Sequence, residues 1–231
     1  MNVKNWRYFD KNEDIGVLKI TKGQFMTGNI LGIIADKKEI LNEEGNMLNA
    51  KSYDYPVRMK FVGSYTGDNY KKIEEDILQK IKILEEEGCR FIVTTGGQLG
   101  LFTPILNQSD LLTVSSPLTI LPFVATTIAS NVKICIINEL TVEENREILK
   151  VLKIDDDVKK RCIFTNKLQE TYYDVRDKKI DHNECIGAYI WDDREDYHGY
   201  LANVQVPVYN SLKICNLIKN IVAHMPYEGV I

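Results

Sequence analysis

Two acidic residues and an arginine follow an apolar stretch of the 231-residue chain. Asp192, Asp193 and Arg194 come directly after residues 186–191, IGAYIW. Neighbouring carboxyl groups raise one another's pKa and an adjacent guanidinium lowers it, so such a cluster can serve in acid/base chemistry or hold a cation. A charged surface turn would have the same composition. The residue types alone leave both interpretations open.

A second apolar stretch, residues 90–95, runs into small and polar residues: Thr94, Thr95, Gly96, Gly97 and Gln98. Glycines and hydroxyl residues at such a point expose backbone N–H groups, which together with a helix N-terminus can bind a carboxylate or a phosphate. The alternative is a tight strand-to-helix turn that needs glycine for its backbone angles. The segment has neither the glycine pattern nor the lysine of the common nucleotide-binding motifs.

Further polar residues end two other apolar stretches. Ser115 and Ser116 follow residues 111–114, and Asn138 ends residues 132–138. Because Pro117 comes next, the two serines would also suit the cap of a helix with proline in its first position. In folds with parallel strands, ligands bind at the carboxyl ends of the strands. This rule selects all these groups as candidates for a binding site.

The elements that must position these groups alternate between strand and helix. Strands are predicted at 15–20, 56–62, 90–95, 111–115, 132–138, 161–165, 186–191 and 206–209, and residues 30–35 are apolar enough to pack. Helices are predicted at 69–88, 118–130 and 211–224 and after Thr141, which forms a capping box with Glu144. This alternation predicts an α/β fold whose parallel sheets are covered on both faces.

The composition excludes several classes of protein. The chain has 29 Lys and Arg against 33 Asp and Glu, a formal charge of −4, and no basic stripe, so we expect no nucleic-acid partner. It contains no apolar run near the roughly 20 residues of a membrane helix, and its start has no signal-peptide pattern. We therefore expect a cytoplasmic protein with no membrane partner.

Four stretches in the same order resemble the aspartate/glutamate racemase superfamily. They are residues 53–66 (YDYPVRMKFVGSYT), 88–102 (GCRFIVTTGGQLGLF), 112–123 (LTVSSPLTILPF) and 187–210. The resemblance implies two pseudo-symmetric Rossmann-like α/β lobes with parallel sheets and an interlobe cleft. Residues 1–104 with 210–231 would form the first lobe, and residues 105–209 the second.

The resemblance also implies a site for a small carboxylic or amino-acid-like molecule, with no cofactor and no metal, and leaves a homodimer open. In racemases of this type, one cysteine from each lobe flanks the substrate's α-carbon, and one removes the proton that the other replaces on the opposite face. Strand-end hydroxyls and amides hold the substrate carboxylates. The matching residues here are Thr94, Thr95, Ser115, Ser116 and Asn138.

The sequence departs from this pattern at both cysteines. The first would fall within Gly96–Gly97 and the second at Asp193. Cys89 and Cys185 each lie eight residues upstream of these positions, about 26 Å along a strand and so at the wrong end of the sheet. Cys135 lies within an apolar strand and is expected in the core. We therefore expect no cysteine at the carboxyl end of a strand.

Two functional hypotheses follow. The first is an enzyme in which Asp193, with Asp192 beside it, acts as a single acid/base and Arg194 orients it or pairs with a substrate carboxylate. One base suits isomerisation, decarboxylation, elimination or hydrolysis better than racemisation. The alternative is a non-catalytic descendant that binds a metabolite or a partner. A true racemase with other bases is the third and least favoured interpretation.

Overall fold

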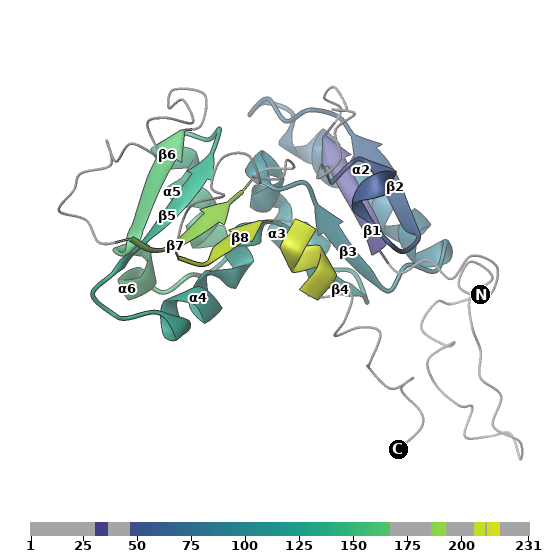
Figure 1. The fold of residues 1–231 in the computed structure, drawn as a ribbon. Coiled ribbons are helices and arrows are strands. Elements are labelled where there is room, and N and C mark those ends of the chain that lie inside the picture. Colours follow the sequence, from purple (N-terminus) through teal and green to yellow (C-terminus); the bar gives the residue numbers. More distant parts are fainter. Residues whose placement is uncertain (1–30, 37–46, 167–185, 193–205, 211, 218–231) are drawn as a thin grey trace, which may run out of the picture.

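The computed structural model describes residues 31–36, 47–166, 186–192, 206–210 and 212–217. Eight strands within these ranges form two separate sheets in two lobes that lie side by side (Figure 1). The first sheet contains β1 (Leu31–Asp36), β2 (Val57–Val62), β3 (Phe91–Thr94) and β4 (Leu112–Val114). The second contains β5 (Lys133–Asn138), β6 (Cys162–Asn166), β7 (Ile186–Trp191) and β8 (Val208–Asn210).

The two sheets share one topology. The first has the strand order β2-β1-β3-β4 and the second β6-β5-β7-β8, and every pair is parallel. The second order repeats the first with each strand four places later in the chain. The predicted α/β fold with two pseudo-symmetric lobes and parallel sheets is thereby confirmed.

One face of the first sheet is covered by α2 (Tyr70–Glu86). Its residues Ile73, Ile77, Ile81 and Leu84 are buried at helical spacing, as the sequence predicts, and they share a core with Ile34 of β1. The short helices η3 (Gly97–Phe102) and α3 (Thr103–Leu106) add buried residues to the same core.

The opposite face of the first sheet is covered by segments far apart in the sequence. Leu31, Ile33 and Phe91 pack there against Met47, near the 3-10 helix η2 (Ala50–Ser52), and against Cys215. Cys215 belongs to the helical residues 212–217, which follow β8 of the second sheet. The chain therefore returns to the core of the first lobe after it completes the second sheet.

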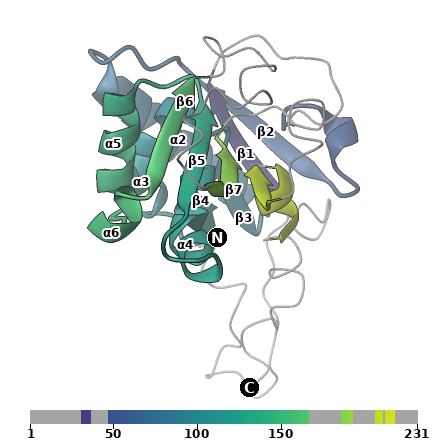
Figure 2. The same cartoon turned by 60° about the vertical axis from the view of Figure 1, so that its left-hand side comes forward.

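The second sheet is covered on one face by the 3-10 helix η4 (Pro117–Ile120) and by α4 (Leu121–Thr127) and α5 (Val142–Val151). Figure 2 shows α5 lying alongside this sheet. The capping box predicted for Thr141 and Glu144 is present at the start of α5. The other face buries Cys135, Ile137, Tyr189 and Trp191.

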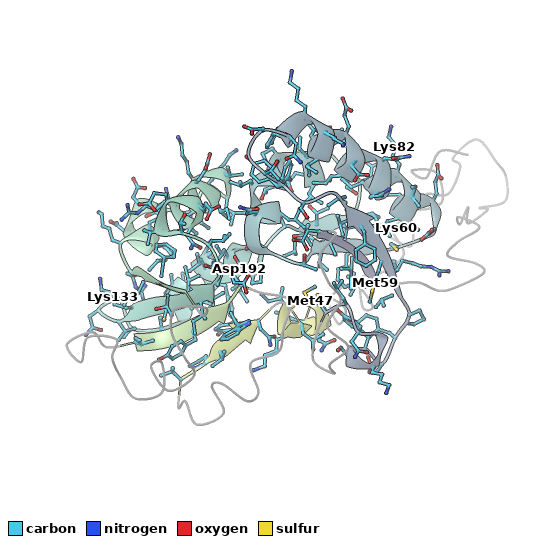
Figure 3. The ribbon with its side chains drawn as sticks, turned by 90° about the horizontal axis from the view of Figure 1, so that it is seen from above. Met47, Met59, Lys60, Lys82, Lys133 and Asp192 are labelled. Carbon is cyan, nitrogen blue, oxygen red and sulfur yellow. The ribbon has the colours of Figure 1, made fainter. Side chains whose placement is uncertain are left out.

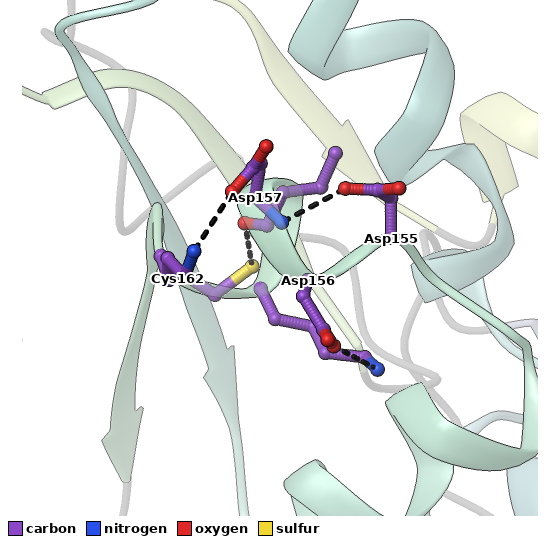
Figure 4. A network of polar contacts seen from close by, with 7 residues as sticks. Asp155, Asp156, Asp157 and Cys162 are labelled. Atoms are coloured by element: carbon purple, nitrogen blue, oxygen red, sulfur yellow. Dashed lines mark hydrogen bonds and ion pairs between the residues drawn. The ribbon is translucent and has the colours of Figure 1, made fainter.

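The acidic run 155–157 begins the short helix α6 (Asp156–Lys159) (Figure 4). The Asp155 side chain accepts a hydrogen bond from the Asp157 N–H at 2.8 Å, which caps the helix. Asp156 and Asp157 form ion pairs with Lys159 and Lys160 on the surface. All three carboxylates therefore interact with residues of α6 or its C-terminal end.

The order of the elements can be compared with the sequence prediction at two places. Among the described residues the first strand is 31–36, and the strand predicted at 15–20 lies outside them and stays a prediction. The sheets change between Val114 and Lys133, whereas the sequence placed the change of lobe at residue 104. Residues beyond 104 stay with the first sheet because Ile105 and Leu106 are buried in the core beneath α2.

Candidate functional site

The carboxyl ends of β3, β4 and β7 meet where the two lobes join. Asp192 directly follows β7, and its N–H donates to the Ile137 carbonyl at 3.0 Å, which extends the pairing of β7 with β5. In Figure 3 Asp192 lies where the two lobes meet. Its side chain is only 2% exposed. The sequence allowed Asp192 to be either an acid/base residue or part of a charged surface turn. The structure shows that it is buried.

The Asp192 carboxylate contacts the first lobe through two donors. The Ser116 hydroxyl lies 3.1 Å from both of its oxygens, and the Gly97 N–H donates to Oδ1 at 3.4 Å. Ser116 is fully buried, so its contact with Asp192 is shielded from solvent. A hydroxyl and a backbone N–H from the first lobe thus hold a carboxylate that the second lobe supplies.

The glycine turn after β3 makes room for this carboxylate. Gly96 has φ 79° and ψ −152°, a backbone conformation that residues other than glycine adopt very rarely. A Cβ atom on Gly96 would come closer than 3.0 Å to Asp192 Oδ1, whereas a Cβ on Gly97 would meet nothing within 4 Å. The Asp192 carboxylate therefore occupies the space that a side chain at position 96 would need.

The other predicted hydroxyls bond within the first lobe. The Thr94 hydroxyl donates to the Ser115 carbonyl and accepts from the Gly96 N–H at 3.2 Å. The Ser115 hydroxyl lies 2.6 Å from that of Thr103. Thr95 is buried, and its N–H donates to the Ile34 carbonyl at 3.2 Å. These groups shape the turn around Gly96. Ser116 caps η4, as the sequence allowed, because its hydroxyl accepts from the Leu118 N–H at 3.1 Å, and the same hydroxyl contacts Asp192.

Gln98 makes a second connection between the lobes. Its Nε2 donates to Glu144 Oε1 at 2.8 Å, and Glu144 also closes the capping box with Thr141. Burial raises the pKa of Glu144, but the hydrogen bonds from Thr141 and Gln98 outweigh that effect and hold the pKa below its usual value. Gln98 therefore ties the turn after β3 to the start of α5.

No protein-family profile and no curated protein matches the sequence. Solved structures do. Unliganded arylmalonate decarboxylase is 12% identical with a TM-score of 0.54, covering 86% of this chain and 94% of its own. An aspartate racemase homologue from Pyrococcus horikoshii OT3 is 13% identical with a TM-score of 0.55, covering 84% and 99%. Allantoin racemase from Klebsiella pneumoniae is 13% identical with a TM-score of 0.53, covering 87% and 94%.

These neighbours decide the fold. The chain shares its fold with this decarboxylase and these racemases, a racemase fold. At 12–13% identity the likeness concerns the course of the backbone, so it assigns no reaction, substrate or residue role.

Asn138 ends β5 of this racemase fold and is bonded to α5. Its Nδ2 donates to Asn145 Oδ1 at 2.7 Å, and its Oδ1 accepts from Asn145 Nδ2 at 3.0 Å and from the Leu140 N–H at 3.1 Å. Both asparagines are buried. Asn145 was not predicted from the sequence, although its place on the apolar face of α5 beside Ile148 and Leu149 signals a buried partner.

Cys215 corrects the expectation that no cysteine lies at the carboxyl edge of the racemase fold's strands. A cavity of about 10 Å³ there, room for about one water molecule, is lined by Met47, Val93, Thr94, Val114, Ser116, Pro117, Ile214 and Cys215. Burial raises the pKa of the Cys215 thiol to about 12, which keeps it protonated. No local pattern around Cys215 signals this position, because the position depends on the return of the chain to the first lobe.

Asp193 and Arg194, the other two predicted acid/base residues, lie outside the described residues of the racemase fold. Within the described ranges, no group of three or more His, Cys, Asp or Glu side chains could hold a metal ion. In the same ranges, no helix combines the length and apolar character that crossing a membrane requires.

Proposed function

We propose that the protein binds a small carboxylic acid or amino-acid-like molecule between its two lobes and catalyses proton transfer on it without a cofactor. The observation that carries this proposal is the contact of Asp192 with the turn at Gly96–Gly97. That turn matches the position of the first thiol in the two-cysteine racemases. A carboxylate from the second lobe thus stands where the first lobe offers no acid or base of its own.

A single carboxylate limits the reaction. Inversion at an α-carbon needs one base on each face, and neither glycine of the turn supplies one. A single acid/base can instead protonate the carbanion left when carbon dioxide departs, or move a proton within one face of the substrate. We therefore favour decarboxylation, isomerisation, elimination or hydrolysis over racemisation.

The structural neighbours include enzymes that catalyse decarboxylation and isomerisation. One of them is a decarboxylase, solved also as a variant in which cysteine replaces a glycine and serine replaces a cysteine. Another is a maleate cis-trans isomerase from Nocardia farcinica, solved with a covalently bound succinylcysteine intermediate. The fold therefore serves reactions other than racemisation. In the present chain we assign the acid/base role to Asp192 and Asp193, with Arg194 orienting them or pairing with a substrate carboxylate.

The proposal is tested by solvent exchange. The protein is incubated in heavy water with both enantiomers of aspartate and glutamate, with phenylmalonate and with maleate, and NMR follows deuterium incorporation and product formation. We expect no exchange into the amino acids, because loss of an acid/base partner costs about 10²–10⁴-fold in rate, roughly 3–5 kcal/mol. Turnover is expected only with an acid that has a more acidic proton or a better leaving group. Racemisation of aspartate or glutamate at an ordinary enzymatic rate would refute the proposal.

A non-catalytic binding protein is the second candidate. It is favoured by one observation, namely that the Ser116 hydroxyl already bonds a carboxylate of the protein itself. Under this alternative, a carboxylic acid would raise the temperature of unfolding but would undergo neither exchange nor turnover. The same heavy-water experiment, run beside thermal unfolding, therefore separates the two candidates.

A further inference from the structure

The contact between Asp192 and Ser116 has the form of a bound carboxylate. Both oxygens lie 3.1 Å from one hydroxyl, and Oδ1 also faces the Gly97 N–H at 3.4 Å. Hydroxyl and backbone N–H donors bind any carboxylate in this way, whether it belongs to a side chain or to a free acid. The first lobe therefore carries a carboxylate site, and Asp192 is its occupant in this structure.

Burial makes this occupancy exclusive. Ser116 is fully buried and Asp192 is 2% exposed, and a serine hydroxyl has a single proton to donate, so a second carboxylate cannot bond Ser116 while Asp192 does. Space beside Oδ1 is restricted as well, because a Cβ atom built on Gly96 would lie closer than 3.0 Å to it. Two carboxylates would also repel each other at this distance.

We propose that Asp192 is an internal competitor for the ligand's carboxylate. The ligand binds Ser116 and the Gly97 N–H in place of Asp192, and the displaced aspartate becomes available to act on the ligand. The inference rests on the proposed function only in that the ligand carries a carboxylate. Asp192 would then have two states, one hydrogen-bonded to Ser116 and one in which that bond is broken and the ligand has replaced it.

Acetate provides a direct probe, because it carries the carboxylate group that an alanine substitution removes from Asp192. In Asp192→Ala, about 100 mM sodium acetate should raise the unfolding temperature by about 3 °C or more, whereas the wild type should shift by less than about 1 °C. Sodium chloride and neutral acetamide at the same concentration should have no such effect. Asp68→Ala, which removes an exposed aspartate, serves as the matched control and should behave as the wild type.

Ser116 is tested in the same background. The double variant Asp192→Ala with Ser116→Ala should lose the acetate-dependent shift, because the hydroxyl that receives the acetate is gone. If Asp192→Ala does not fold, Asp192→Asn keeps the side-chain volume, and its neutral amide should let acetate bind at least about tenfold more tightly than in the wild type. An equal acetate response in wild type and variants, no response in either variant, or a response that persists without Ser116 would each overturn the inference.

The outcome is separable from that of the proposed function, because acetate binding requires no turnover. Acetate-dependent stabilisation in a protein that turns over none of the acids in heavy water would support the competition and reject the enzyme. Turnover in a protein whose Asp192→Ala variant ignores acetate would reject the competition and support the enzyme.

Discussion

The ends of β3 and β7 hold the same place in two sheets of the same order, yet they carry opposite chemistry. After β3 come Thr95, Gly96 and Gly97, which contribute backbone and hydroxyl groups, and after β7 comes the buried carboxylate of Asp192. In a two-cysteine racemase both ends would carry the same reactive group. The difference teaches that in this chain one lobe supplies hydrogen-bond donors and the other supplies a buried carboxylate.

The largest effect on the reaction rate is expected when the carboxylate after β7 is removed. Asp192→Asn should lower the rate on the acid found by solvent exchange by about 10²–10⁴-fold while the ligand still binds. Asp193→Asn, measured beside it, should abolish turnover and change binding by no more than about tenfold if Asp193 is the base. The variant with the larger loss identifies the base.

Asp68→Asn makes the same change at an exposed position and should leave the exchange rate as in the wild type. Unchanged turnover in both Asp192→Asn and Asp193→Asn would remove the carboxylates from the mechanism and leave the binding protein as the better interpretation.

The next effect concerns the glycines after β3. Gly96→Ala should lower the free energy of unfolding by about 3 kcal/mol, because its backbone angles suit glycine alone and its Cβ would strike Asp192. Gly97→Ala is the matched control, since its Cβ meets nothing within 4 Å, and the strain of its φ of 60° should cost about 1 kcal/mol. Urea titration measures both values. Equal losses would show that Asp192 does not fill the space beside Gly96.

A smaller effect should arise at the second connection between the lobes. The pKa of Glu144 is lowered in the folded protein, so its contribution to stability is present above the unfolded value near 4.3 and is lost as the pH falls through the folded value. Glu144→Gln should therefore cost less than about 1 kcal/mol at pH 7, and the cost should shrink as the pH falls below the unfolded value. Glu143→Gln, at the exposed neighbouring position, is the control in the same urea titrations. A cost that does not shrink as the pH falls would contradict this assignment.

The smallest effect is expected from alkylation of the cysteines. Burial raises the pKa of Cys89, Cys162 and Cys215 to about 12, so at pH 8 only about 10⁻⁴ of each thiol is ionised. Iodoacetamide should leave ligand binding and turnover unchanged over an hour. Rapid inactivation that the ligand prevents, mapped by mass spectrometry to Cys185 or Cys89, would show that a thiol acts in the site.

Local patterns in the sequence predicted much of the fold. The spacing of Ile73, Ile77 and Ile81 predicted α2, and Thr141 with Glu144 predicted the start of α5, because both signals arise from contacts within a few residues. The alternation of strands and helices predicted parallel sheets for the same reason. The strand edge that carries the polar groups then followed from a general rule of such folds.

What the sequence did not predict depends on contacts between distant segments. The partnership of Asn138 with Asn145 and the place of Cys215 beside Thr94 both require knowledge of how elements pack. The bond between Asp192 and Ser116 joins residues 76 positions apart, so no window along the chain contains it. The sequence therefore named Asp192 and Ser116 but not the bond between them.

The return of residues 212–217 to the first lobe has a consequence for synthesis of the chain. One face of the first sheet is covered partly by Ile214 and Cys215, which the ribosome adds long after Leu31 and Phe91. The nascent chain must therefore carry an incompletely covered apolar surface while the whole second sheet is made, a state in which exposed strands attract chaperones or other chains. The first lobe therefore completes its core only after the second sheet has been synthesised.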